Sequence, residues 1–120
     1  MTTRLDAQTR RYLAASRATP PETLAILARD RASRVREAAA SNPSTPADAL
    51  ARLATDRDEW VHHATATNQS TPPDVLAALA LSQWFGIRVA VAGNPSTSPA
   101  TLARLASDRS NWVREAAARS

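Results

Sequence analysis

Residues 42–67 read NPSTPADALARLATDRDEWVHHATAT, and residues 94–119 read NPSTSPATLARLASDRSNWVREAAAR. The two stretches agree at most of their positions, and the same pattern returns halfway between them and once before them. Each position therefore recurs every 26 residues, with no insertion or deletion. Self-similarity at a fixed period of this length predicts a stack of structural repeats, each of which buries its apolar face against its neighbours.

Two short helices are predicted in each unit. Residues 19–22, TPPE, are typical of a helix start in which Thr19 accepts from the first turn and the acidic residue completes a capping box. Leu24 and Leu27 then fall on one helical face, and Val35 marks a second short helix. The recurring leucines, which we expect to be buried, are Leu24, Leu50, Leu76 and Leu102, and Leu27, Leu53, Leu79 and Leu105.

The second helix of each unit is expected to end at asparagine. Asn42 and Asn94 are each followed by proline, which blocks continuation, and asparagine tolerates the left-handed backbone conformation. Helices this short do not persist alone in water, so the units must be held by stacking. We therefore predict an all-α, curved α-solenoid in one domain, with an N-terminal capping helix in a half-repeat at residues 1–16. Its four 26-residue helix-pair repeats are expected at residues 17–41, 42–67, 68–93 and 94–120.

The last unit has no dedicated polar cap. The final predicted helix, residues 112–118, is followed only by an arginine and a serine. We expect this end to be covered by a partner, to support self-association, or to continue in a longer protein.

Composition limits the classes of function. The chain has no cysteine, which excludes disulfides, thiolate metal sites and cysteine nucleophiles. All 15 basic residues are arginine, and the net charge is +4, but residues 41–80 carry 2 arginines against 5 acidic residues. A continuous basic track is therefore not expected. Residues 1–6 contain no apolar run and no long apolar stretch follows, so we predict a cytoplasmic protein with no membrane contact.

The repeated motif resembles a known family. Residues 42–46, NPSTP, are followed by leucine and alanine at fixed spacing, then Asp56 and the pair Trp60-Val61, and the chain in this respect resembles the leucine-rich repeat variant (LRV) family. It is also similar to HEAT repeats, which share an aspartate six residues before an arginine. The resemblance implies a superhelical stack that alternates an α-helix with a shorter, 3₁₀-like helix, and it implies no common enzymatic activity.

A column of basic residues runs through the units as Arg10, Arg36, His62, Arg88 and Arg114. Guanidinium groups suit phosphate, but charged groups near a core are usually paired. We therefore expect a structural ladder in which these arginines bond a column of aspartates along the stack. The residues assigned to that ladder are Asp30, Arg36, Asp56, Asp108 and Arg114. Two departures interrupt it, because His62 replaces an arginine and Ser82 replaces an aspartate.

No constellation of catalytic residues is recognisable. His62 and His63 are adjacent, so on a helix they point about 100° apart and cannot chelate one metal together. The chain has only two glycines and no serine in a nucleophile-elbow context. We predict a non-enzymatic protein without catalytic residues, cofactor or metal, because function must be argued from a site.

The third unit departs from the others at Trp84, Phe85 and Arg88. Aromatic residues and arginine anchor many interfaces, so these three residues are predicted to contact a partner. The competing interpretation is repacking, in which an aromatic ring fills the space above Gly86 that tryptophan fills in other units. The predicted function is a repeat scaffold that mediates protein–protein interaction. The alternative is binding of nucleic-acid phosphates through surface arginines.

Overall fold

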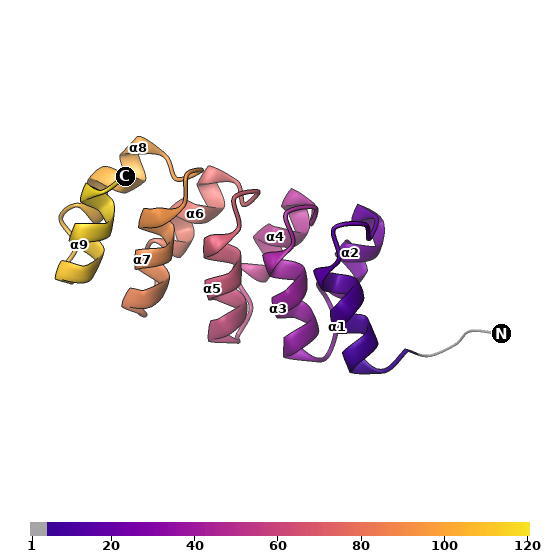
Figure 1. Ribbon diagram of the computed structural model, residues 1–120. Helices are drawn as coiled ribbons and strands as arrows, with labels where there is room; N and C mark the ends of the chain where they lie inside the picture. The colour runs from indigo at the N-terminus through magenta and orange to yellow at the C-terminus, as the bar shows by residue number, and fades with distance from the viewer. Residues whose placement is uncertain (1–4) are drawn as a thin grey trace.

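The computed structural model describes residues 5–120, and within them the chain is all helical (Figure 1). The predicted all-α fold is therefore confirmed, while residues 1–4 of the expected capping half-repeat lie outside the described residues. The helices are α1 (Ala7–Ala15), α2 (Pro21–Leu27), α3 (Ser33–Ser41), α4 (Ala47–Leu53), α5 (Glu59–Thr67), α6 (Pro73–Leu79), α7 (Phe85–Gly93), α8 (Pro99–Leu105) and α9 (Asn111–Ala118).

The helices form two parallel rows. The odd-numbered helices stand side by side, each packed on the next, and the even-numbered helices form the row behind them (Figure 1). Each even-numbered helix packs on the odd-numbered helices before and after it in the chain. The described residues measure 56 Å along the stack and about 20 Å across it, as expected for a repeat solenoid.

A longer and a shorter helix alternate along the chain, as the resemblance implied. The first helix has seven residues and the second has nine, or eight in the last unit, and both are α-helical rather than 3₁₀-like. The first helix is short because an Asx turn follows it. In the first unit, Asp30 Oδ1 accepts the Ala32 N–H at 2.9 Å, which competes with helix continuation.

The threonine column does not cap the helix that follows it, so the predicted capping box is wrong. Pro20 occupies the cap position of α2 without a side-chain bond, and Thr19 instead donates its hydroxyl to Leu13 O at 2.6 Å. Thr45, Thr71 and Thr97 donate in the same way to the carbonyl six residues earlier. The last carbonyls of a helix have no helical partner, and the threonine hydroxyl satisfies one of them.

The asparagine column connects neighbouring units and does not adopt the predicted left-handed conformation. Asn68 has φ −78° and ψ 121°, and no described residue has a positive φ. Its Nδ2 donates to Ala40 O at 2.8 Å and to Asn42 O at 2.9 Å, while its Oδ1 accepts the Ser70 N–H. Asn42 and Asn94 make the equivalent bonds. These buried amides are therefore cross-links between units, fully satisfied as burial requires.

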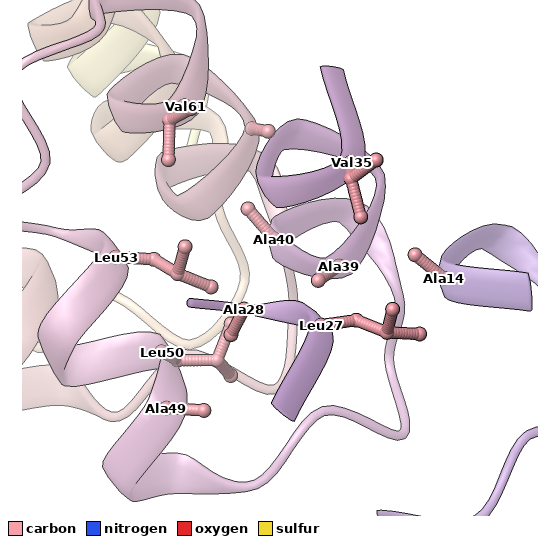
Figure 2. Close-up of a cluster of buried hydrophobic side chains, with 11 residues drawn as sticks. Ala14, Leu27, Ala28, Val35, Ala39, Ala40, Ala49, Leu50, Leu53 and Val61 are labelled. Carbon is pink, nitrogen blue, oxygen red and sulfur yellow. The ribbon is translucent and has the colours of Figure 1, made fainter. Parts of the chain in front are cut away.

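The leucine columns form the core, as predicted. Seven of the eight recurring leucines are buried, and Leu102 in the last unit is partly exposed. Figure 2 shows the N-terminal part of this core, where Leu50 and Leu53 from α4 lie beside alanines of α3. A second cluster fills the C-terminal half, and the boundary between the two clusters falls within α5, between Ala64 and Ala66.

Candidate protein-interaction site

Three ion pairs connect successive units along one edge of the stack. The Nε of the arginine lies 2.7 Å from the aspartate Oδ2 in Arg10–Asp30 and Arg36–Asp56, and 2.8 Å in Arg88–Asp108. In each pair, Nη2 donates to the other carboxylate oxygen at 3.1–3.3 Å. The arginine thus grips the aspartate with two parallel bonds, which is the strongest geometry available to this pair of groups.

Each of these arginines pairs with the aspartate of the following unit, 20 residues later. Arg36 has an aspartate six residues before it as well, Asp30, but does not pair with that carboxylate. Toward its own unit, Arg36 donates Nη1 to the backbone carbonyls of Asp30, at 2.8 Å, and Arg31, at 3.2 Å. Arg114 makes the same bond to the carbonyl of Asp108, at 2.7 Å, and its side chain is exposed. The partner of Asp108 is therefore Arg88 rather than Arg114, because the guanidinium fork faces the next unit.

The three paired carboxyl groups have a lowered pKa. Burial alone would raise the pKa of Asp30, Asp56 and Asp108, but the bonds from the paired arginine and from the backbone N–H two residues on outweigh it. A lowered folded-state pKa stabilises the fold at any pH above the unfolded value of about 4. That stabilisation is lost as the pH falls through the folded value.

Acid is therefore expected to weaken the stack. The free energy of unfolding from urea titrations should hold near pH 7 and fall progressively below about pH 4, where the unfolded chain binds more protons than the folded chain. The variant Asp108→Asn has one such carboxyl fewer and should lose less stability between pH 7 and pH 3. Equal losses in the variant and the parent would show that this pair does not contribute to the acid response.

One ion pair is missing, between the second and third units. By the 20-residue offset, His62 on α5 faces Ser82 in the turn after α6, so the two departures seen in the sequence are the two halves of one junction. The Nε2 atom of His62 is buried without a hydrogen-bond partner among the described residues. The Trp84 ring lies edge-on to the imidazole, with 5.9 Å between ring centroids.

A pocket of about 220 Å³ lies at this junction. Its lining residues are Ala54, His62, Ala78, Leu79, Leu81, Ser82, Gln83 and Trp84. Larger pockets, of about 470 and 490 Å³, lie at the paired junctions Arg36–Asp56 and Arg10–Asp30, but only this one has no arginine or aspartate in its lining. Cavities of this kind lose packing contacts unless something fills them.

The turn over this pocket is uncharged. Residues 81–85 read LSQWF, whereas the equivalent turns at residues 29–33, 55–59 and 107–111 read RDRAS, TDRDE and SDRSN. Leu81 is 68% exposed and Phe85 is 52% exposed. The third turn therefore presents apolar side chains to solvent where every other turn presents charges.

Of the predicted contact residues, the structure places two at this turn. Phe85 protrudes, and Trp84 is half-buried against the pocket and the second core cluster. Arg88 is a correction to the prediction, because its side chain is buried and its guanidinium is occupied by Asp108 and by Ser82 O. Sequence reasoning missed Leu81, although its column also holds Arg29, Thr55 and Ser107 and would have marked it as unusual.

Four of the five aromatic side chains lie on the surface of this protein. Tyr12, Trp60, Phe85 and Trp112 are all more than half exposed. Trp60 and Trp112, which occupy the same position in two units, are each 64% exposed. A side chain at Gly86 would meet nothing within 4 Å, so the glycine leaves no internal void for a ring to fill.

Between residues 5 and 120, no group of three or more histidine, aspartate and glutamate side chains is placed to hold a metal ion. Within the same range, no helix combines the length and apolar character needed to cross a membrane.

Comparison with known proteins identifies the repeat. Residues 34–58 and 85–110 match the family model described as leucine rich repeat variant. Both matches begin at the start of an odd-numbered helix and extend through the next even-numbered helix. Neither the curated proteins nor the solved structures gave a match. The two matched segments are leucine rich repeat variant repeats, and the family resemblance predicted from the sequence is confirmed.

Proposed function

We propose that this repeat scaffold is non-enzymatic and binds a protein partner through the turn at residues 81–85, together with the pocket beneath it. The observation that carries the proposal is the replacement of charged residues by exposed Leu81 and Phe85 at one turn of an otherwise regular stack. Apolar residues gathered at one exposed place on a small protein favour an interaction site. Aromatic and aliphatic anchors of this kind supply most of the binding energy at protein interfaces.

The scaffold supports such a role because its two cores and three ion pairs fix the positions of the turns. Stacked repeats present an extended surface in which each turn is a separate contact point. Because the turn is apolar in only one unit, the surface has one distinct binding site for a partner.

The alternative hypothesis, binding of nucleic acid, was based on arginines that the structure shows to be engaged. Arg10, Arg36 and Arg88 hold aspartates of the same chain, so their guanidinium groups are not free for phosphate. A mobility-shift assay with duplex nucleic acid tests this alternative. Binding that weakens steeply as salt rises would contradict the proposal that the partner is a protein.

The proposal is tested with the double variant Leu81→Ser, Phe85→Ser. Proteins captured from a lysate of the source cells by the parent chain should be reduced at least tenfold with the double variant, since losing two anchors costs more than about 2 kcal/mol. Ile26→Ser is the matched control, because Ile26 is also an apolar side chain, 71% exposed, on a regular repeat. Circular dichroism establishes that both variants are folded. Unchanged capture by the folded double variant would refute the proposal.

A further inference from the structure

The pocket at the missing ion pair contains two unused hydrogen-bond groups. His62 Nε2 is buried and has no partner among the described residues. Ser82 Oγ accepts the Trp84 N–H at 3.2 Å, and its own hydroxyl hydrogen finds no acceptor within residues 5–120. A buried polar atom without a hydrogen-bond partner destabilises the fold. A ligand group that bonds this atom removes that cost, and the recovered free energy favours binding.

The equivalent position in the other turns shows which group is absent. At residues 30, 56 and 108 a carboxylate accepts two bonds from a side chain of the previous odd-numbered helix. At residue 82 no carboxylate is present, although His62 still projects from that helix toward the turn and lines the same pocket. The register of the repeat therefore places the His62 imidazole where the other junctions have a guanidinium, with no carboxylate opposite it.

The surrounding charges favour an incoming anion. No acidic residue of the described chain lines the pocket, and the aspartates of the two adjoining junctions, Asp56 and Asp108, are each paired with an arginine. Arg88 donates Nη1 to Ser82 O at 2.8 Å, which places a guanidinium beside the pocket. The turn itself carries no acidic side chain that would repel an anion.

We infer that the pocket between His62 and Ser82 receives an aspartate or glutamate side chain of the protein partner. This inference rests on the proposed function, whose apolar turn supplies the surrounding contact area. The incoming carboxylate accepts hydrogen bonds from His62 Nε2–H and from the Ser82 hydroxyl. Leu81 and Trp84 form the walls of the pocket, so the acidic residue is flanked by apolar residues in the partner.

The first experiment uses sodium acetate as the probe. The imidazole Cε1–H signals of His62 and His63 are followed by NMR during titration with acetate, against sodium chloride at equal ionic strength. His62 should shift saturably with acetate, while His63, which is exposed on the same helix, should not. The absence of a saturable shift, or equal shifts at both histidines, would overturn the inference.

Two variants make the result specific. Ser82→Asp supplies the carboxylate within the chain and should abolish the acetate response of His62. An aspartate fits this turn, since three other turns carry one that accepts the N–H two residues on. Ser82→Asn is the matched neutral control and should still respond to acetate. A response that survives in Ser82→Asp would overturn the placement of the site.

A displayed library of random peptides identifies the source of the carboxylate. Peptides enriched on the parent chain should contain an acidic residue next to apolar ones, and changing that residue to its amide should weaken binding at least tenfold. Acetate binding with no acidic preference among the peptides would overturn a partner side chain in favour of a small free carboxylate. Loss of capture in the Leu81→Ser, Phe85→Ser variant, without acetate binding, would leave the proposed function standing and overturn only this inference.

Discussion

Replacing Leu53 with alanine is expected to lower the free energy of unfolding by about 2–5 kcal/mol. The Leu53 side chain is 1% exposed, and in Figure 2 it extends from α4 into the N-terminal core cluster. Removing it leaves a cavity that the neighbours, most of them alanines, are too small to fill. A domain of this size has a total stability of about 5–15 kcal/mol, so the variant loses a large share of it.

Urea or thermal denaturation of the parent and the variant measures this loss. Ile26→Ala is the control, because Ile26 lies on the equivalent helix of the previous unit but is 71% exposed, and its loss should stay within about 0.5 kcal/mol. If both variants unfolded at the parent's midpoint, the leucine columns would not be the core.

Asp108→Ala is expected to cost about 3 kcal/mol, more than an ordinary surface change. The cost arises because Arg88, whose side chain is 5% exposed, is left as a buried charge with only the Ser82 carbonyl as a partner. Ser110 also loses the acceptor of its backbone N–H. Removing one partner of a buried ion pair destabilises the fold more than replacing both partners by apolar residues.

The double variant Asp108→Ala, Arg88→Met separates the two contributions. Removing the buried charge as well should recover part of the stability lost by Asp108→Ala in the same denaturation experiment. Asp48→Ala, an exposed carboxylate in the first turn of α4, serves as the control and should have a small effect. No recovery in the double variant would show that Arg88 is not strained by losing its partner.

The sequence predicted the helices and the core because both follow from local spacing. Leu24 and Leu27 repeat with a helical period inside a unit, and their columns repeat with the unit. Burial is what creates such periodicity, so the pattern carried the fold class directly.

The polar contacts were harder to predict, because their partners lie in another unit. Asn42 looked like a helix terminator, and nothing local shows that its amide reaches Ala14 O, 28 residues earlier. The sequence predicted that the arginine and aspartate columns bond along the stack, but not that each observed pair spans 20 residues. How the units stack determines which side chains become partners. A single sequence shows which positions are equivalent in each unit, but not which of those positions contact one another across units.

The candidate site could be located only in part. Trp84 and Phe85 stood out by breaking their columns, but the unpaired imidazole of His62 depends on the cross-unit offset and became visible only with the structure. The residue type did not predict that Trp60 is exposed. A tryptophan next to a core position can lie on either the buried or the exposed face of a helix.

The asparagine cross-links have a consequence for how such a chain can change in length. Asn42, Asn68 and Asn94 each bond carbonyls 26 and 28 residues earlier, so every unit offers the same acceptors to the unit after it. A tandem duplication of 78 bases of coding DNA adds 26 codons and gives the new unit all of its partners at once. A gain or loss that is not a multiple of 26 codons turns the amides away from those carbonyls, so arrays of this kind grow and shrink in whole units.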